Sequence, residues 1–160
     1  MTARGWLLLL VACCATAAQA AVFRGTVTHV TDGDTLWVRP ASGGKPVEIR
    51  LIDLDAPEGC QRFGAESRQA LARRVLHETV RVRSRGTDEY DRALARVEHR
   101  QQDVGGWMVR RGFAWSATFR DKPGPYAKLE RQARAERAGL WSVPGALEPR
   151  SFRKRFGRCQ

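Results

Sequence analysis

The sequence predicts a mainly β domain of the α+β class: a five-stranded OB-type barrel with about three helices. Three observations favour this fold. Five short segments have the composition and alternation of strands, and three segments have helical spacing, one between the strands and two after them. At 160 residues, the chain is also long enough to form one domain with its own core.

The expected strands are rich in β-branched residues and are separated by turn signals. The turn TDGDT and the loop PASGGKP separate the first three strands. In the third strand, Val47, Ile49 and Leu51 alternate with Glu48 and Arg50, which predicts one apolar and one polar face. We expect strands over residues 22–30, 36–38, 47–54, 80–83 and 92–98.

The expected helices have recognisable ends. The first covers 64–77, where apolar residues recur on one side. The second begins after the N-cap residue Asp103 and ends at Gly112, although two glycines in its first turn destabilise it by about 1 kcal/mol each relative to alanine. The third begins near Pro125 and ends at Gly139.

The first twenty residues have the pattern of a signal peptide. Arg4 precedes an apolar run that is too short to span a bilayer comfortably, and a small-x-small site predicts cleavage after Ala20. A less well-formed alternative is a lipoprotein site at Cys13. We therefore expect a secreted or periplasmic protein, composed of a signal peptide (1–20), an OB-type domain (21–148) and a basic C-terminal tail (149–160).

The chain is strongly basic. It has 28 Lys and Arg against 17 Asp and Glu, a formal net charge of +11, and removal of Arg4 with the signal peptide leaves +10. Such a charge favours a polyanionic partner, either nucleic acid or an anionic membrane surface. Because arginine greatly outnumbers lysine, codon usage is an alternative explanation, and the basic segment RSFRKRFGR is typical of a solvated tail.

Two groups of acidic residues lie where neighbouring strands end. Asp32 and Asp34 belong to the turn after the first strand, and Asp53, Asp55 and Glu58 lie at the end of the third. Taken singly, each has an ordinary explanation, since Asp-Gly is a common hairpin turn and carboxylates two residues apart can share a solvated face. If the groups converge, however, the carboxylates repel one another unless arginine or a metal ion lies between them. An all-oxygen ligand set suits Ca²⁺ or Mg²⁺ rather than Zn²⁺.

Two arginines lie near these acids in the sequence. Arg50 is on the polar face of the third strand, and Arg92 begins the fifth. Such residues are usually only surface charges. Phosphodiester hydrolysis, however, requires an activated water, a positive clamp on the phosphate and a metal ion, which a carboxylate base, an arginine pair and an acid-bound cation would supply.

Three segments, in this order, resemble the thermonuclease family of the micrococcal nuclease type: VTDGDT at 30–35, IRLIDLDAPE at 49–58 and DEYDRALA at 88–95. MVRRGFAW and ARAERAGLW are similar to later helices of the family. The resemblance covers about residues 22–142. It implies an OB barrel with three helices and an endonuclease that cleaves DNA and RNA to leave 3′-phosphate ends.

The resemblance also implies a role for each site residue. Asp34, Asp55 and the backbone carbonyl of Ala56 match the ligands of a catalytic Ca²⁺, with Mg²⁺ as the alternative. Glu58 matches the general base, while Arg50 and Arg92 match the arginines that bind the phosphate. Tyr90 matches an aromatic residue that lines the nucleotide site, and Asp32 and Asp53 would support the metal ligands.

One position departs from the family pattern. The family usually has glycine before the second arginine, where this chain has Asp91, so that a carboxylate would hold Arg92 away from substrate or contact the metal. The complete set of site residues favours a monomeric Ca²⁺-dependent phosphodiesterase that acts on DNA and RNA without an obligate protein partner. The alternative is an OB-type nucleic-acid-binding protein with little catalytic activity.

Cys60 and Cys159 are the two cysteines that remain after cleavage at Ala20. An even number of cysteines in an exported chain favours a disulfide between them, with two free thiols as the alternative. A bridge would hold the basic tail beside the loop that follows Glu58.

Overall fold

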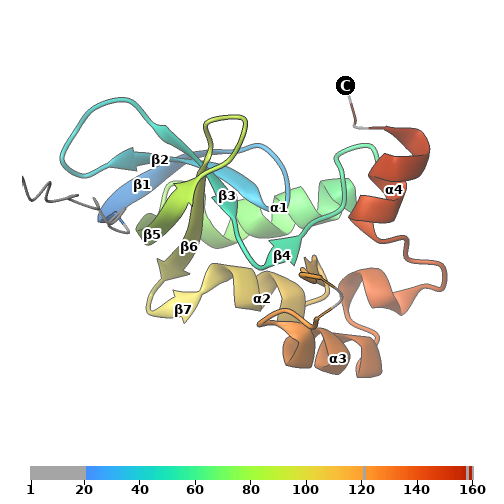
Figure 1. Ribbon diagram of the computed structural model, residues 1–160. Coiled ribbons are helices and arrows are strands. Elements are labelled where there is room, and N and C mark those ends of the chain that lie inside the picture. Colours follow the sequence, from blue (N-terminus) through green and yellow to red (C-terminus); the bar gives the residue numbers. More distant parts are fainter. Residues whose placement is uncertain (1–20, 121, 158, 160) are drawn as a thin grey trace, which may run out of the picture.

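The computed structural model describes residues 21–120, 122–157 and 159. Its centre is a closed five-stranded barrel, in which the strand order is β3-β2-β1-β5-β6 and β6 pairs in parallel with β3 to close the barrel (Figure 1). These strands are β1 (Val22–Val30), β2 (Thr35–Pro40), β3 (Val47–Leu51), β5 (Thr79–Thr87) and β6 (Ala93–His99). The prediction of a mainly β, five-stranded barrel is confirmed.

The predicted third strand is shorter in the structure because the chain turns sharply at Asp53. This residue has a φ of 70°, in the left-handed region that a strand does not use. Residues 47–54 are therefore divided between β3 and a two-residue strand, β4 (Leu54–Asp55), which pairs with β8 (Trp115–Ser116). A further short strand, β7 (Gln102–Asp103), pairs with the end of β6.

The described residues also form four α-helices and one 3₁₀ segment. They are α1 (Gly64–Val75), α2 (Val104–Arg110), α3 (Ala127–Ala135), the 3₁₀ segment η1 (Gly139–Ser142) and α4 (Pro149–Phe156). Of these, α1 and α2 pack against barrel strands and α3 packs against α2. A side chain at Gly105 would be crowded where α2 meets its neighbours, since a Cβ there would lie 3.0 Å from Leu54 and 3.1 Å from the hydroxyl of Tyr126. This close packing explains a glycine that the helix by itself disfavours.

The fourth helix changes the interpretation of the C-terminal segment 149–160, which was expected to be a loose basic tail. Pro149 is the first residue of α4, the basic residues of its last turn complement the helix dipole, and Gly157 ends it with a φ of 81°. Figure 1 shows α4 beside the segment that leads from β4 to α1. A disulfide between Cys60 and Cys159, whose Cα atoms lie 5.6 Å apart, joins the two.

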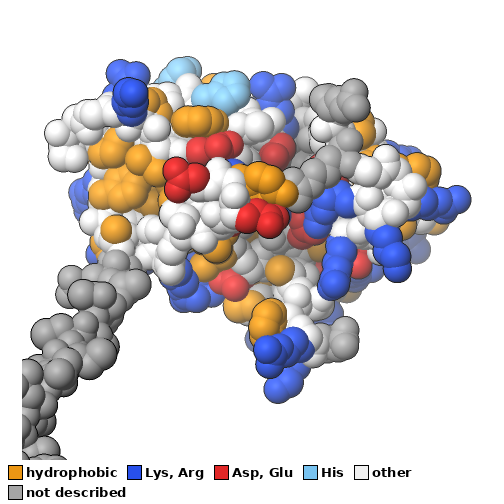
Figure 2. Space-filling view, turned by 45° about the horizontal axis from the view of Figure 1, so that its top comes forward, with side chains coloured by type: hydrophobic (Ala, Val, Ile, Leu, Met, Phe, Trp, Pro, Cys, Tyr) orange, Lys and Arg blue, Asp and Glu red, His pale blue; other side chains and the backbone are white. Residues whose placement is uncertain are grey.

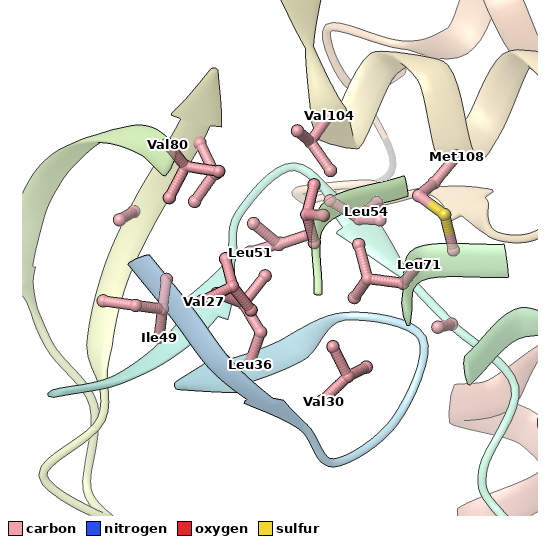
Figure 3. Packing of buried hydrophobic residues seen from close by; sticks show 14 of the residues in the cluster. Val27, Val30, Leu36, Ile49, Leu51, Leu54, Leu71, Val80, Val104 and Met108 are labelled. Carbon is pink, nitrogen blue, oxygen red and sulfur yellow. The ribbon is translucent and has the colours of Figure 1, made fainter. Parts of the chain in front are cut away.

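The alternating strand residues form one core. Val27, Leu36, Ile49 and Val80 point into the barrel, and Leu71 packs against it from α1 (Figure 3). All five side chains are almost completely buried. This core supports the strand ends that carry the acidic residues.

The predicted signal peptide (1–20) and the alternative site at Cys13 lie outside the described residues. Over the part of the chain that is described, no helix is both long and apolar enough to cross a membrane.

Candidate active site

A polar cavity collects the predicted site residues from several elements. Its lining comprises Asp32, Asp34, Arg50, Asp55, Ala56, Pro57, Glu58, Arg92 and Arg153. The structure therefore brings together every residue predicted to act in catalysis or to bind metal. On the face shown in Figure 2, Asp and Glu side chains gather near the centre, and Lys and Arg side chains lie mainly around them.

The strand register explains why these residues converge. Thr35 of β2 pairs with Arg50 of β3, so Asp34 lies directly beside Arg50. Ile49 of β3 pairs with Ala93 of β6, which places Arg92 at the same end of the barrel. Three distant parts of the sequence thus meet because β3 has β2 on one side and β6 on the other.

The turn before β2 packs tightly against the loop after β4. A Cβ on Gly33 would lie 1.9 Å from Oγ of Ser67 in α1 and 2.7 Å from Cβ of Ala56, so only glycine fits there. The backbone N–H of Asp34 donates to Oδ1 of Asp32 (2.9 Å), and Oδ2 of Asp34 accepts from the N–H of Ala56 (2.7 Å). Asp32 therefore contacts the backbone of a predicted ligand, and Asp34 itself is almost fully buried.

Arg50 connects the two predicted carboxylate ligands. Its guanidinium forms an ion pair with Asp34 through Nη1, and Nη2 donates to Oδ1 of Asp55 (3.1 Å). Burial lowers the pKa of Arg50, although Asp55 and Asp32 partly offset this effect. Burial also raises the pKa of Asp32, against the attraction of Arg50. A positive charge thus already lies between the carboxylates that the sequence assigns to a cation.

The donors at this position fit a hard cation in their chemistry. Two carboxylates and a neighbouring backbone carbonyl supply oxygen alone, as Ca²⁺ and Mg²⁺ prefer. Within the described residues, no group of three or more His, Cys, Asp and Glu side chains is arranged to hold a metal ion. A cation here would consequently depend on Asp34, Asp55, backbone oxygen and water or substrate.

Arg153 of α4 contacts both Glu58 and Asp55. Its Nη1 donates to Glu58 (2.7 Å) and to Oδ1 of Asp55 (3.2 Å), and its Nη2 donates to Oδ2 of Asp55 (2.8 Å). The hydrogen bonds to Asp55, followed by those to Glu58, raise the pKa of Arg153 despite the opposing effect of burial. The predicted base and one predicted ligand thus share a guanidinium from the C-terminal segment.

Asp88, rather than Asp91, holds Arg92. The Asp88 carboxylate accepts from Nε of Arg92 at 2.8 Å and pairs with Nη2 at 2.7 Å. Desolvation tends to raise the pKa of Asp88, but hydrogen bonds from Arg92 and from the backbone of Tyr90 outweigh it and lower the pKa. The predicted substrate-binding residue Tyr90 is exposed, and the centre of its ring lies 5.3 Å from the Arg92 guanidinium carbon.

The backbone explains the departure at Asp91. This residue has a φ of 61°, a conformation that glycine adopts freely and that aspartate tolerates better than most residues. Its N–H donates to the carbonyl of Asp88 (3.1 Å), which closes the turn before Arg92. Aspartate therefore serves the same backbone role that glycine would.

Asp53 is separated from the cavity that it was expected to support. The left-handed turn directs it toward Arg96, whose Nε and Nη2 both donate to Oδ2 of Asp53, at 3.0 and 2.6 Å. Asp53 is not part of the cavity lining, whereas Asp55 is. The two carboxylates therefore do not share a face.

Sequence reasoning missed two residues of this site. Asp88 lies four positions before Arg92 and begins the family-like segment DEYDRALA, so the sequence itself points to this part of the chain. Arg153 has no comparable local signal, because it reaches Glu58 from 95 positions away. The cysteine six residues later was the one indication that this segment returns to the site.

Comparisons with known proteins identify the family. Residues 48–143 match the model described as "Staphylococcal nuclease homologue". The chain is 39% identical over 145 residues to Protein ParB of Escherichia coli, covering 84% of this chain and 81% of that protein. It is 37% identical over 143 residues to the Micrococcal nuclease of Shigella flexneri, with 82% and 81% covered. It is 34% identical over 128 residues to an uncharacterized endonuclease of Haemophilus influenzae, with 80% and 71% covered.

Proposed function

The chain belongs to the staphylococcal nuclease homologue family, and from this premise we propose that it is a metal-dependent endonuclease. Its substrates are the phosphodiester bonds of DNA and RNA. The observation that carries this proposal is the meeting of two carboxylates, a candidate base and two arginines in one polar cavity. A pure binding protein would have no need of this complete set.

Asp34, Asp55 and the carbonyl of Ala56 would hold a divalent cation, for which Ca²⁺ is the proposed identity. When bound, such a cation supplies positive charge to a phosphate oxygen and helps to orient the reacting groups. The ion pairs of Arg50 with Asp34 and Asp55 support this proposal, because they place a positive charge between the same two carboxylates. A cation bound there would displace the Arg50 guanidinium from them.

The protein side chains divide the remaining chemistry. Glu58 accepts a proton from the water that attacks phosphorus, while Arg50 and Arg92 bind phosphate oxygens and stabilise the negative charge that develops on them. The bond from phosphorus to the 5′-oxygen then breaks, the 5′-oxygen takes up a proton from solvent water, and the phosphate remains on the 3′ side. Asp88 orients Arg92 for this role through the contacts described above.

The proposed location is the periplasm or the cell exterior. The apolar segment at residues 1–20 supports export. The disulfide between Cys60 and Cys159 also favours an oxidising compartment, because disulfides rarely persist in the cytosol.

A plasmid-degradation assay tests the proposed function. The purified chain without residues 1–20 is expected to degrade plasmid DNA in Ca²⁺, more slowly in Mg²⁺, and not at all in excess chelator. Circular dichroism recorded in chelator should remain that of the folded protein, because the barrel core is independent of the site. Undiminished cleavage in chelator would overturn the metal assignment, and binding without cleavage under all conditions would favour the non-catalytic alternative.

Salt dependence tests whether the positive charge captures substrate. Binding of an oligonucleotide to a Glu58→Ala variant is expected to fall linearly on a plot of log affinity against log salt, because Lys and Arg release counterions from the phosphates. Fluorescence anisotropy between low and moderate salt would measure the slope. An affinity that does not change with salt would mean that the net charge of +10 that remains without residues 1–20 has no role in capture.

A further inference from the structure

Arg153 is held in the cavity by its hydrogen bonds and by the position of α4. Its side chain is only 28% exposed and makes hydrogen bonds to two different carboxylates. By contrast, its neighbour Lys154 in α4 is exposed. Arg153 is thus the α4 residue that the helix orientation directs into the site.

Three contacts hold α4 in that orientation. The disulfide joins Cys159 to Cys60, two residues after Glu58. Nε2 of Gln61 donates to the carbonyl of Leu147 (2.6 Å), just before the helix. Phe152 lines an apolar cavity together with residues such as Trp115 and Leu140. Arg153 therefore occupies a defined position beside the candidate base.

Arg50 makes contacts with the cavity carboxylates that are similar to those of Arg153. Like Arg153, it binds Asp55, and each guanidinium also binds a second carboxylate of the cavity. A cation held by Asp34 and Asp55 would take over carboxylates that now bind both arginines. Their guanidiniums would then be available to another anion in the same cavity.

The charge of the lining indicates what that anion is. Four carboxylates (Asp32, Asp34, Asp55 and Glu58) and three guanidiniums (Arg50, Arg92 and Arg153) give a formal charge of −4 + 3 = −1. A divalent cation changes this charge to +1. A phosphate group of the substrate then satisfies the excess positive charge, and arginine binds phosphate with two parallel hydrogen bonds.

We propose that Arg153 is a third substrate-binding arginine, which holds Asp55 and Glu58 in the metal-free protein and binds a substrate phosphate once a cation occupies Asp55. This inference rests on the proposed nuclease function. It makes α4 and its disulfide part of the active site, and it gives Glu58 a way to exchange its arginine partner for water when substrate binds.

The proposal predicts two effects of opposite sign. Removing the guanidinium removes a competitor for Asp55, so Ca²⁺ should bind more tightly in the absence of nucleotide. The same change removes a phosphate contact, so an anionic nucleotide should bind more weakly in the presence of saturating Ca²⁺. A residue that only supported the fold would not produce both effects.

Calorimetry on Arg153→Ala, Arg153→Lys and Lys154→Ala tests these effects. Lys154→Ala is the matched control, because it removes the same charge from an exposed position of the same helix. We expect Arg153→Ala to bind Ca²⁺ about tenfold more tightly than the wild type, and a nucleoside 3′,5′-bisphosphate about 10- to 100-fold more weakly, as the loss of charge-assisted hydrogen bonds implies. This probe contains no phosphodiester to hydrolyse. Arg153→Lys should recover part of the nucleotide affinity, and Lys154→Ala should match the wild type.

Unchanged nucleotide affinity in Arg153→Ala would overturn the proposal, as would equal losses in Arg153→Ala and Lys154→Ala. Faster plasmid cleavage by Arg153→Ala would also overturn it, because Arg153 would then only obstruct the site. The wild-type plasmid assay separates this test from that of the proposed function. If the wild type fails to cleave, the function is wrong, while the two binding measurements still decide the role of Arg153.

Discussion

Replacing Glu58 with alanine is expected to lower turnover roughly 10²- to 10⁴-fold, the usual range for the loss of a general base. Substrate affinity should remain close to that of the wild type, because Glu58 is proposed to act on water rather than on the phosphate. Steady-state kinetics on a defined oligonucleotide would separate kcat from KM. In the same assay, Arg92→Ala should lower kcat and raise KM together, since its guanidinium is proposed to bind the phosphate in both ground and transition states.

Two further variants make this test sharper. Glu58→Gln keeps an oxygen that can accept the hydrogen bond from Arg153 but cannot serve as an effective base, so it should lose as much turnover as the alanine variant. Glu66→Gln removes a carboxylate from an exposed position in the first turn of α1 and should leave turnover unchanged. If Glu58→Gln retained nearly the wild-type rate, Glu58 would be a contact for Arg153 and not the base.

Loss of the disulfide is expected to lower the free energy of unfolding more than any of the other substitutions discussed above. The bridge closes a loop across a sequence separation of 99. For a loop of about 100 residues, the chain-entropy model gives about 4.7 kcal/mol as an upper value, and measured bridges typically contribute about 2–4 kcal/mol. A Cys60→Ser/Cys159→Ser variant should therefore show a lower free energy of unfolding by an amount in that range, measured in a denaturant titration.

The reduced wild type is the control for this variant, because it lacks the same bond without any substitution. Both should lose a similar amount of stability, and both should bind the nucleotide probe more weakly, since α4 would no longer hold Arg153 in place. Proteolysis of the unreduced protein followed by mass spectrometry should show the Cys60 and Cys159 peptides linked. Alkylation of both thiols under native, non-reducing conditions would exclude the bridge.

The family and the barrel could be predicted because the sequence patterns that indicate them involve neighbouring residues. Alternation along Val47, Ile49 and Leu51 is set by the two-residue period of a strand, whatever the strand later contacts. The acidic turn, the segment around Glu58 and the segment around Arg92 are each continuous in sequence. Their meeting was expected from the resemblance, and the register of β3 with β2 and β6 is the structural cause. The roles of Asp34, Arg50, Asp55, Glu58 and Arg92 remain predictions.

Backbone conformation decided what the acids do individually. Asp53 and Asp55 are equivalent in the sequence pattern, but a positive φ at Asp53 turns its carboxylate to Arg96 and leaves Asp55 in the cavity. Similarly, Asp91 was expected either to hold Arg92 or to contact the metal, yet Asp91 forms a turn and Asp88 makes the contacts with Arg92. A left-handed residue turns the backbone out of the extended path of a strand, and residue type alone only weakly indicates where this occurs.

By itself, the sequence determined a basic five-stranded barrel with a nuclease-like set of acids and arginines, because periodicity and short motifs are properties of neighbouring residues. Only the tertiary structure placed Arg153 against Glu58 and Asp55. That contact depends on the packing of α4 against residues that are distant from it in the sequence. Phe152 and the Cys60–Cys159 bridge hold the helix there. Contacts of such long sequence separation arise from the packing of the whole domain, so no local pattern in RSFRKRFGR distinguishes a solvated tail from a helix that contacts the candidate site.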